Sequence, residues 1–198
     1  MLTAIGDVMR RCYERGWITT RDGNISLRYA NSDTLYITPS GWRKTIIHPE
    51  HVVRLKFNGH KIEDSSGVKP SGELEMHRVL QLNCSSTRAV VHVHPTHIVA
   101  AMFSGWDLQE LSAEFPEVSR YTRVGRVVPK LPATSKELAE ATSRSMLDTG
   151  GLFTCDIVGQ ENHGVCSIGP DPWTAYEHIE RLDHICEIAL KSGIRPKN

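Results

Sequence analysis

The pattern of apolar and polar residues along this chain alternates between segments with helical periodicity and segments with strand periodicity. Apolar residues recur every three or four positions over residues 2–16, which predicts an amphipathic helix that ends near Gly16. The same period predicts further helices over residues 71–82, 98–102 and 135–147, and a last one from Asp171-Pro172 onward.

Short apolar or alternating runs between these helices predict strands. They cover residues 25–29, 35–38, 52–57, 60–62, 89–93, 152–158 and 165–168. Asn58-Gly59 is a dipeptide typical of a tight hairpin turn. Residues 104–134 contain three prolines and are expected to be irregular. Because hairpins interleave with helices, we expect one α/β domain over residues 1–198, with a largely antiparallel sheet covered by helices.

Composition narrows the class of protein. The chain has 198 residues, which suits one domain with a sizeable core, and its 23 basic residues balance its 23 acidic residues. This balance gives no support for a nucleic-acid or membrane partner. The five cysteines lack a Cys-x-x-Cys spacing, and the charged N-terminal segment is neither a signal peptide nor a membrane span. We therefore expect a cytoplasmic protein with free thiols.

Two histidines lie two residues apart at the end of the predicted strand 89–93. Side chains at positions i and i+2 of a strand share a face, so His92 and His94 project together. Neutral imidazole is a common metal ligand, and the pair therefore predicts a metal site. Two buried, hydrogen-bonded histidines are the alternative interpretation.

A third ligand has to come from elsewhere in the chain. His163 lies in the turn between two predicted strands, where Gly164 permits a tight bend. His97 competes for this role, but the helix that follows Pro95 turns it away from the strand face. We therefore prefer His163, and we expect the remaining histidines at the surface or in the core.

Three glycine- and hydroxyl-rich turns lie at the ends of predicted elements. They contain Gly23 and Asn24, then Thr38, Ser40 and Gly41, and last Ser71 and Gly72, which we expect at the cap of helix 71–82. Free N–H groups in such turns and at helix starts bind anions. One such turn alone is usually only a turn, but three together indicate a phosphate held largely by neutral donors. Arg43 and Lys44 follow the second turn.

Glu73 lies in the predicted first turn of helix 71–82. A carboxylate there either stabilises the helix through its dipole or acts as an acid/base beside a metal, and nothing local decides between these roles. His77 lies on the same helix face, where it is either a partner of the site or solvated.

Five short motifs, taken in their order and spacing, resemble those of the class II aldolase/adducin family. They are Gly23-Asn24-Ile25-Ser26, Thr38-Pro39-Ser40-Gly41, Pro70-Ser71-Gly72-Glu73, His92-Val93-His94 and Asn162-His163-Gly164. The similarity spans roughly residues 2–190 and is nearest to the L-fuculose-1-phosphate aldolases. The family also contains rhamnulose-1-phosphate aldolases, pentulose-5-phosphate 4-epimerases, methylthioribulose-1-phosphate dehydratases and non-catalytic adducin head domains.

The resemblance implies a three-layer α/β/α fold around a mainly antiparallel sheet, and a homotetramer with active sites between subunits. It implies zinc bound by His92, His94 and His163, Glu73 as the catalytic acid/base, and the three turns as the cradle of a sugar phosphate. The expected reaction cleaves a ketose 1-phosphate to dihydroxyacetone phosphate and an aldehyde. Dehydration or epimerisation at the same site, or a non-catalytic module, are the alternatives.

Two features depart from the pattern of the family. Gly72 occupies the place where a second serine is common, so one hydroxyl donor to the phosphate is missing. The sequence ends at Asn198, whereas L-fuculose-1-phosphate aldolases carry a longer tail with a tyrosine that reaches the active site. Tyr121 of a neighbouring subunit is the candidate to replace that tyrosine on the aldehyde side.

Overall fold

The structure, a computed structural model, describes residues 1–58, 61–63, 67–82 and 86–196. Within these ranges seven strands form one antiparallel sheet in the order β4-β3-β2-β1-β5-β7-β6. The strands are β1 (Asn24–Arg28), β2 (Thr34–Ile37), β3 (Val53–Asn58), β4 (Lys61–Glu63), β5 (Arg88–Val93), β6 (Ile157–Gln160) and β7 (Gly164–Gly169). The helices are α1 (Leu2–Glu14), α2 (Leu74–Gln81), α3 (Thr96–Phe103), α4 (Leu108–Ala113), α5 (Pro116–Tyr121), α6 (Lys136–Met146) and α7 (Pro172–Lys191).

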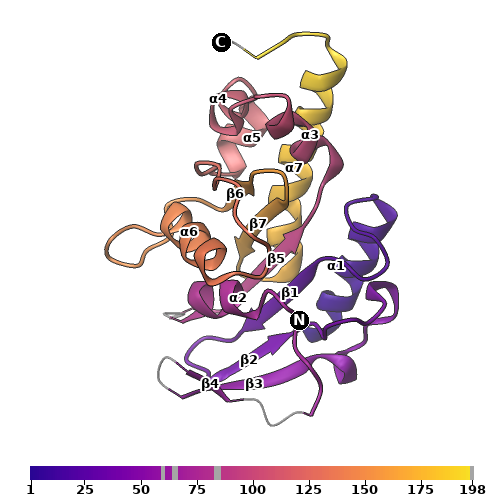
Figure 1. Cartoon of the computed structure of the whole chain (residues 1–198), viewed down its shortest axis with the longest axis vertical. Coiled ribbons are helices and arrows are strands. Elements are labelled where there is room, and N and C mark those ends of the chain that lie inside the picture. Colours follow the sequence, from indigo (N-terminus) through magenta and orange to yellow (C-terminus); the bar gives the residue numbers. More distant parts are fainter. Residues whose placement is uncertain (59–60, 64–66, 83–85, 197–198) are drawn as a thin grey trace.

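Helices cover both faces of the sheet, which confirms the α/β fold class and its three layers. Helices α1, α3 and α7 pack on one face, and α2 and α6 pack on the other (Figure 1). The alternation of side chains along β5 separates the two cores. Val91 and Val93 belong to the core beneath α7, whereas Val90 belongs to the core beneath α6. His92 therefore lies on the face that α2 and α6 cover.

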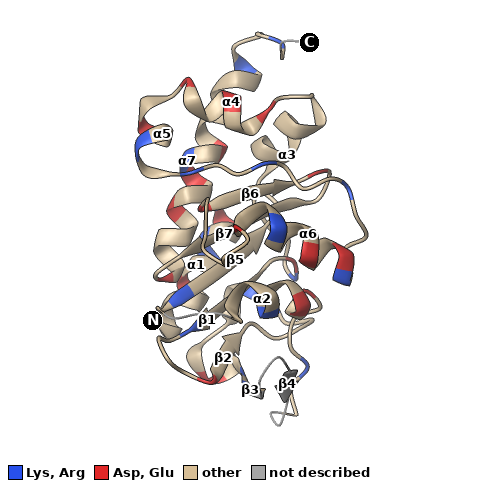
Figure 2. Ribbon diagram, turned by 90° about the vertical axis from the view of Figure 1, so that its left-hand side faces the viewer, with Lys and Arg blue, Asp and Glu red and all other residues tan. Residues whose placement is uncertain are grey.

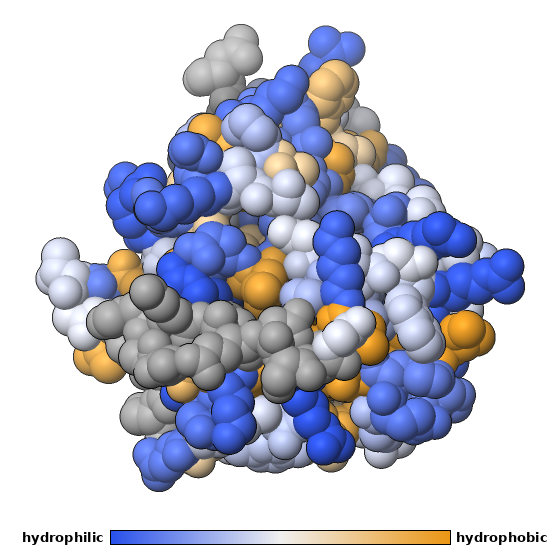
Figure 3. Space-filling view, turned by 60° about the horizontal axis from the view of Figure 1, so that its bottom comes forward, coloured by the Kyte–Doolittle hydropathy of each residue, from blue (hydrophilic) through white to orange (hydrophobic). Residues whose placement is uncertain are grey.

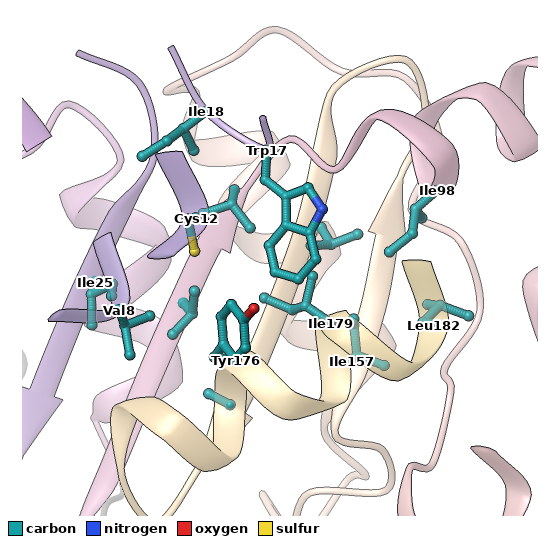
Figure 4. Packing of buried hydrophobic residues seen from close by; sticks show 14 of the residues in the cluster. Val8, Cys12, Trp17, Ile18, Ile25, Ile98, Ile157, Tyr176, Ile179 and Leu182 are labelled. Carbon is teal, nitrogen blue, oxygen red and sulfur yellow. The ribbon is translucent and has the colours of Figure 1, made fainter. Parts of the chain in front are cut away.

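The larger core also fixes the backbone at the end of β5. The ring of Trp17 packs 5.1 Å from that of Tyr176 on α7 (Figure 4). Nε1 of Trp17 donates to the buried carboxylate of Asp183 at 3.0 Å. Ile179 and Leu182 of the same helix are fully buried, and each such side chain contributes about 1.5–3 kcal/mol. The carbonyl of Trp17 accepts the backbone N–H of His94 at 3.0 Å, so this core holds the residue that follows β5.

Two predicted helices are confirmed, and each is capped by a side chain. Ser135 caps α6 by accepting from the N–H of Leu138. Asp171 caps α7 by accepting from two backbone N–H groups, and Pro172 is its first residue.

Four local predictions need correction. Helix α2 begins at Leu74 with Glu73 at the N-cap position, so Ser71 and Gly72 precede the cap. The stretch 104–134, expected to be irregular, contains α4 and α5. Strand β6 begins at Ile157, because the preceding residues form a loop with a single bridge to Leu147. The helix predicted over residues 98–102 is longer, because α3 begins at Thr96, directly after Pro95, and ends at Phe103. The turn predicted at Asn58-Gly59 lies partly outside the described residues.

The surface is mixed in charge and polarity. Figure 2 shows acidic and basic residues interspersed over the helices, and Figure 3 shows small apolar areas separated by hydrophilic ones on the face in view. In the described ranges, no helix has both the length and the apolarity needed to cross a membrane. The cysteines in these ranges, Cys12, Cys155, Cys166 and Cys186, are buried free thiols.

Candidate active site

A pocket open to solvent lies where the start of β1, the end of β5 and the start of α2 meet. All three histidines of the predicted metal site line it, as does Glu73. Six of the seven residues assigned to phosphate binding line it too, namely Gly23, Asn24, Ser40, Gly41, Ser71 and Gly72. Residues from all five sequence motifs therefore meet in one place.

The structure brings the three histidines together, with one possible ligand atom of each within 4.8 Å of the others. Nδ1 of His92 donates to the carbonyl of Val165 at 2.9 Å, which leaves Nε2 with a lone pair. This Nε2 lies 3.2 Å from Nε2 of His94. Two nitrogens bound tetrahedrally to zinc at about 2.0–2.1 Å would be about 3.3–3.4 Å apart, so the spacing fits one shared ion.

His163 completes the cluster from the turn between β6 and β7. Its ring centroid lies 4.8 Å from that of His92 and 5.2 Å from that of His94. Its Nδ1 is buried and has no hydrogen-bond partner among the described residues. Burying a polar atom without a partner costs free energy, and a bound cation is one way to recover it. The donor set therefore fits a metal ion.

Gly164 is needed at this turn because the backbones approach closely. A Cβ at this position would lie 2.4 Å from the carbonyl oxygen of Val93 and 2.7 Å from Cδ2 of His94. Only glycine lets β7 pack against β5 and the His94 ring at this distance.

Burial keeps two of the imidazoles neutral, which is the state that binds metals. The pKa of His94 falls to about 4, first because of burial and then because of the neighbouring His163. The pKa of His92 lies well below its usual value, again mainly because of burial. His97 points elsewhere, as the sequence predicts, because its Nδ1 lies 3.1 Å from the Asp183 carboxylate.

His77 is a buried partner of the site and is not solvated. Its Nδ1 lies 2.7 Å from Oγ of Ser26, and its Nε2 lies 2.5 Å from Oδ1 of Asn24. Burial lowers its pKa to about 3, so the ring is neutral and bridges the two side chains. With its carbonyl oxygen occupied by His77, Asn24 keeps its amide N–H groups for the pocket.

Glu73 is 7% exposed and lies at the N-terminal edge of α2. Its Oε1 accepts from the backbone N–H of Thr134 at 2.9 Å. Burial raises the pKa of this carboxyl, while the Thr134 N–H and His163 act in the opposite direction. Thr134 has a left-handed φ of 63°, which is rare for a β-branched residue. Sequence reasoning missed Thr134 because it lies in the stretch without a clear period.

The second and third turns are joined into one cradle. Thr38 is fully buried beneath the pocket wall, where its Oγ1 accepts from Ile25 N–H and its carbonyl accepts from Ser71 N–H. Thr38 therefore supports the turns and does not line the pocket. Within the described chain, the N–H groups of Gly41 and Gly72 donate to no other protein group. Such free donors suit an anion.

Three further residues named from the sequence lie in different surroundings. Lys44 is buried in the pocket wall, whereas its neighbour Arg43 is exposed and outside the pocket. Tyr121 is 50% exposed on α5, with the guanidinium groups of Arg120 and Arg181 over its ring, and it does not line the pocket of its own chain.

The fold and the pocket together define a layered α/β protein with a candidate three-histidine metal site. The model of the class II aldolase and adducin N-terminal domain matches residues 3–190, so the chain belongs to this family. An L-fuculose phosphate aldolase of Methanococcus maripaludis is 31% identical over 187 residues, which cover 94% of both chains.

Two other relatives cover nearly the whole chain. A probable methylthioribulose-1-phosphate dehydratase of Drosophila melanogaster is 28% identical over 98% of this chain and 90% of its own length. The crystal structure of a sugar-phosphate aldolase from Thermotoga maritima superposes with a TM-score of 0.78 at 23% identity, over 98% of this chain and 97% of that one. The fold of the family is thus shared throughout the chain.

Proposed function

We propose that this chain is a zinc-dependent class II aldolase that cleaves a ketose 1-phosphate to dihydroxyacetone phosphate and an aldehyde. The observation that supports this most directly is the meeting of the three histidines, Glu73 and the glycine-rich turns in one pocket. A zinc ion held by His92, His94 and His163 would supply Lewis-acid polarisation of the substrate carbonyl.

The chain's own residues would bind the phosphate and move the proton. The free N–H groups of Gly41 and Gly72 and the amide of Asn24 would hold the phosphate and so orient the ketose. When the carbon–carbon bond breaks, its electron pair stays on the carbon of the dihydroxyacetone half, and Glu73 delivers a proton there. Burial raises the pKa of Glu73 and so favours the proton-carrying form that this step requires.

The aldehyde forms as the hydroxyl on the other carbon loses its proton. Tyr121 of a neighbouring subunit is the proposed residue on the aldehyde side of the substrate. A homotetramer would bring this tyrosine to the pocket.

A sugar-phosphate dehydratase is the second candidate, because the Drosophila relative matches 98% of the chain. A pentulose-phosphate 4-epimerase would use the same pocket. A non-catalytic adducin-like module is disfavoured, because it has no need of a three-histidine cluster beside a buried carboxyl.

A panel of ketose 1-phosphates and methylthioribulose 1-phosphate, offered to zinc-loaded protein, tests the proposal. The aldolase forms dihydroxyacetone phosphate, which a coupled glycerol-phosphate dehydrogenase assay detects. Loss of water from methylthioribulose 1-phosphate without that product would identify a dehydratase instead.

A further inference from the structure

A buried lysine lies in the pocket wall among the turns assigned to phosphate binding. Lys44 begins the short 3-10 helix η1 (Lys44–Ile46), and its side chain is 2% exposed. It lines the pocket together with Ser40 and Ser71. Its backbone N–H donates at 2.9 Å to the carbonyl of Thr20, which lies in the connection between α1 and β1. This hydrogen bond holds Lys44 in place.

Within the described part of the chain, the ammonium group of Lys44 has no bonded counter-ion. Among the described residues, no carboxylate forms an ion pair with it. Its single protein partner in those ranges is the carbonyl of Pro39, at 2.9 Å from Nζ. An ammonium has three N–H donors, so two remain for a ligand. Because a buried cation is costly unless an anion is paired with it, the pocket favours an anionic occupant.

The other charged groups around the pocket neither neutralise the Lys44 ammonium nor substitute for it. Asp22 lines the pocket and raises the pKa of Lys44, but burial has the larger effect and lowers that pKa to about 8. Arg21 also lines the pocket, but its side chain is exposed, where water and salt screen its charge.

We propose that Lys44 binds the substrate phosphate directly and selects a phosphate dianion over an uncharged sugar. This inference rests on the proposed sugar-phosphate function and adds a positive charge to the neutral donors of the turns. The N–H groups of Gly41 and Gly72 give the phosphate its orientation, and Lys44 gives it a charge-assisted hydrogen bond.

Phosphate binding to zinc-loaded protein, measured by calorimetry at pH 7 with inorganic phosphate as the probe, tests this assignment. Lys44→Met keeps the apolar stem and removes the charge, and it should weaken binding by about 10- to 100-fold. Arg43→Met removes the adjacent exposed charge and should leave the affinity within about twofold. If Lys44→Met fails to fold, Lys44→Gln takes its place in the comparison, because it also removes the charge but retains an N–H donor. Circular dichroism and zinc content should match the wild type in all three.

The pH dependence of phosphate affinity distinguishes an effect of the Lys44 charge from a structural effect of its side chain. Since the pKa of Lys44 is about 8 in the empty pocket, the ammonium is present at pH 7 and largely lost by pH 9.5. The affinity ratio of wild type to Lys44→Met should therefore fall by about an order of magnitude across that interval. Other charged groups that line the pocket are common to both proteins and cancel in the ratio: Arg21, Asp22, Glu73, His92, His94 and His163.

Three results would overturn the assignment. Equal phosphate affinity in wild type and Lys44→Met would mean that the turns or the metal bind the anion without the lysine. A ratio that stays constant from pH 7 to 9.5 would make Lys44 a structural residue. No phosphate binding by zinc-loaded wild type would reject Lys44 and the proposed sugar-phosphate function together, whereas the first two results leave that function intact.

Discussion

At the scale of single residues, the pocket holds two ionisable groups of opposite charge whose burial opposes ionisation. Burial raises the pKa of the Glu73 carboxyl and lowers that of the Lys44 ammonium to about 8. Both values therefore move toward neutral pH, where a group exchanges protons readily. The two groups nevertheless have different partners. Thr134 orients the carboxyl, whereas Pro39 leaves the ammonium free to bind a ligand.

Glu73→Gln separates the catalytic role of Glu73 from a structural one. The amide is nearly isosteric and can still accept the Thr134 N–H, but it cannot carry the proton. We expect unchanged zinc content and a rate lowered by about 10²–10⁴-fold. If Glu73 only stabilises the start of α2, the rate should stay the same and stability should fall by roughly 0.3–1 kcal/mol. Proton exchange into dihydroxyacetone phosphate in heavy water, followed by NMR, measures the step without the aldehyde.

At the scale of elements, the site depends on how closely strand ends approach each other. Strand β5 carries His92, and the register of β5 with β7 places Val93 opposite Val165. The turn before β7 consequently brings His163 beside His94. Helix α3 begins immediately after this strand and carries His97 to the other face, toward Asp183.

His163→Ala and His97→Ala form a matched pair that tests this arrangement. We expect His163→Ala to lower zinc occupancy and abolish turnover, because it removes one of three ligands. His97→Ala should keep its metal, since that ring contacts α7. Elemental analysis of both variants and of the wild type, expected to hold about one zinc per chain, gives the answer. Metal retained in His163→Ala but lost in His97→Ala would show that the third ligand is misassigned.

Elements with strong periodicity and recognisable caps were predictable from sequence, and short ones were not. The period of α7 and its Asp171 cap gave a clear signal. Helices α4 and α5 are six residues each, too short to show a period, although Asp107 and Pro116 are typical helix-start residues. The sequence assigned no role to Thr134, because its contact with Glu73 joins positions far apart in the chain. It assigned none to Lys44, because no motif marks the contact of that side chain with Pro39.

At the scale of the whole molecule, one chain contains the three-histidine cluster and the glycine-rich turns, but no tyrosine among the described residues lines its pocket. Tyr121 lies on the surface, half exposed. Phe103 and Leu152 are 79% and 70% exposed, which is unusual for large apolar side chains and suits contact with other subunits. These features agree with the proposed homotetramer, in which a neighbour would contribute Tyr121.

Light scattering should give a mass about four times the 22.2 kDa of one chain. Mixing two inactive chains then tests whether each site draws on two subunits. Tyr121→Phe should lower turnover without loss of zinc, and Glu73→Gln should do the same. In tetramers assembled at random from equal amounts of both, about a quarter of the sites would combine an intact Glu73 with an intact Tyr121 of the adjacent chain. Co-expression should thus restore about a quarter of wild-type activity. No restoration would place both residues in one chain's site, and full activity of Tyr121→Phe alone would remove Tyr121 from the reaction.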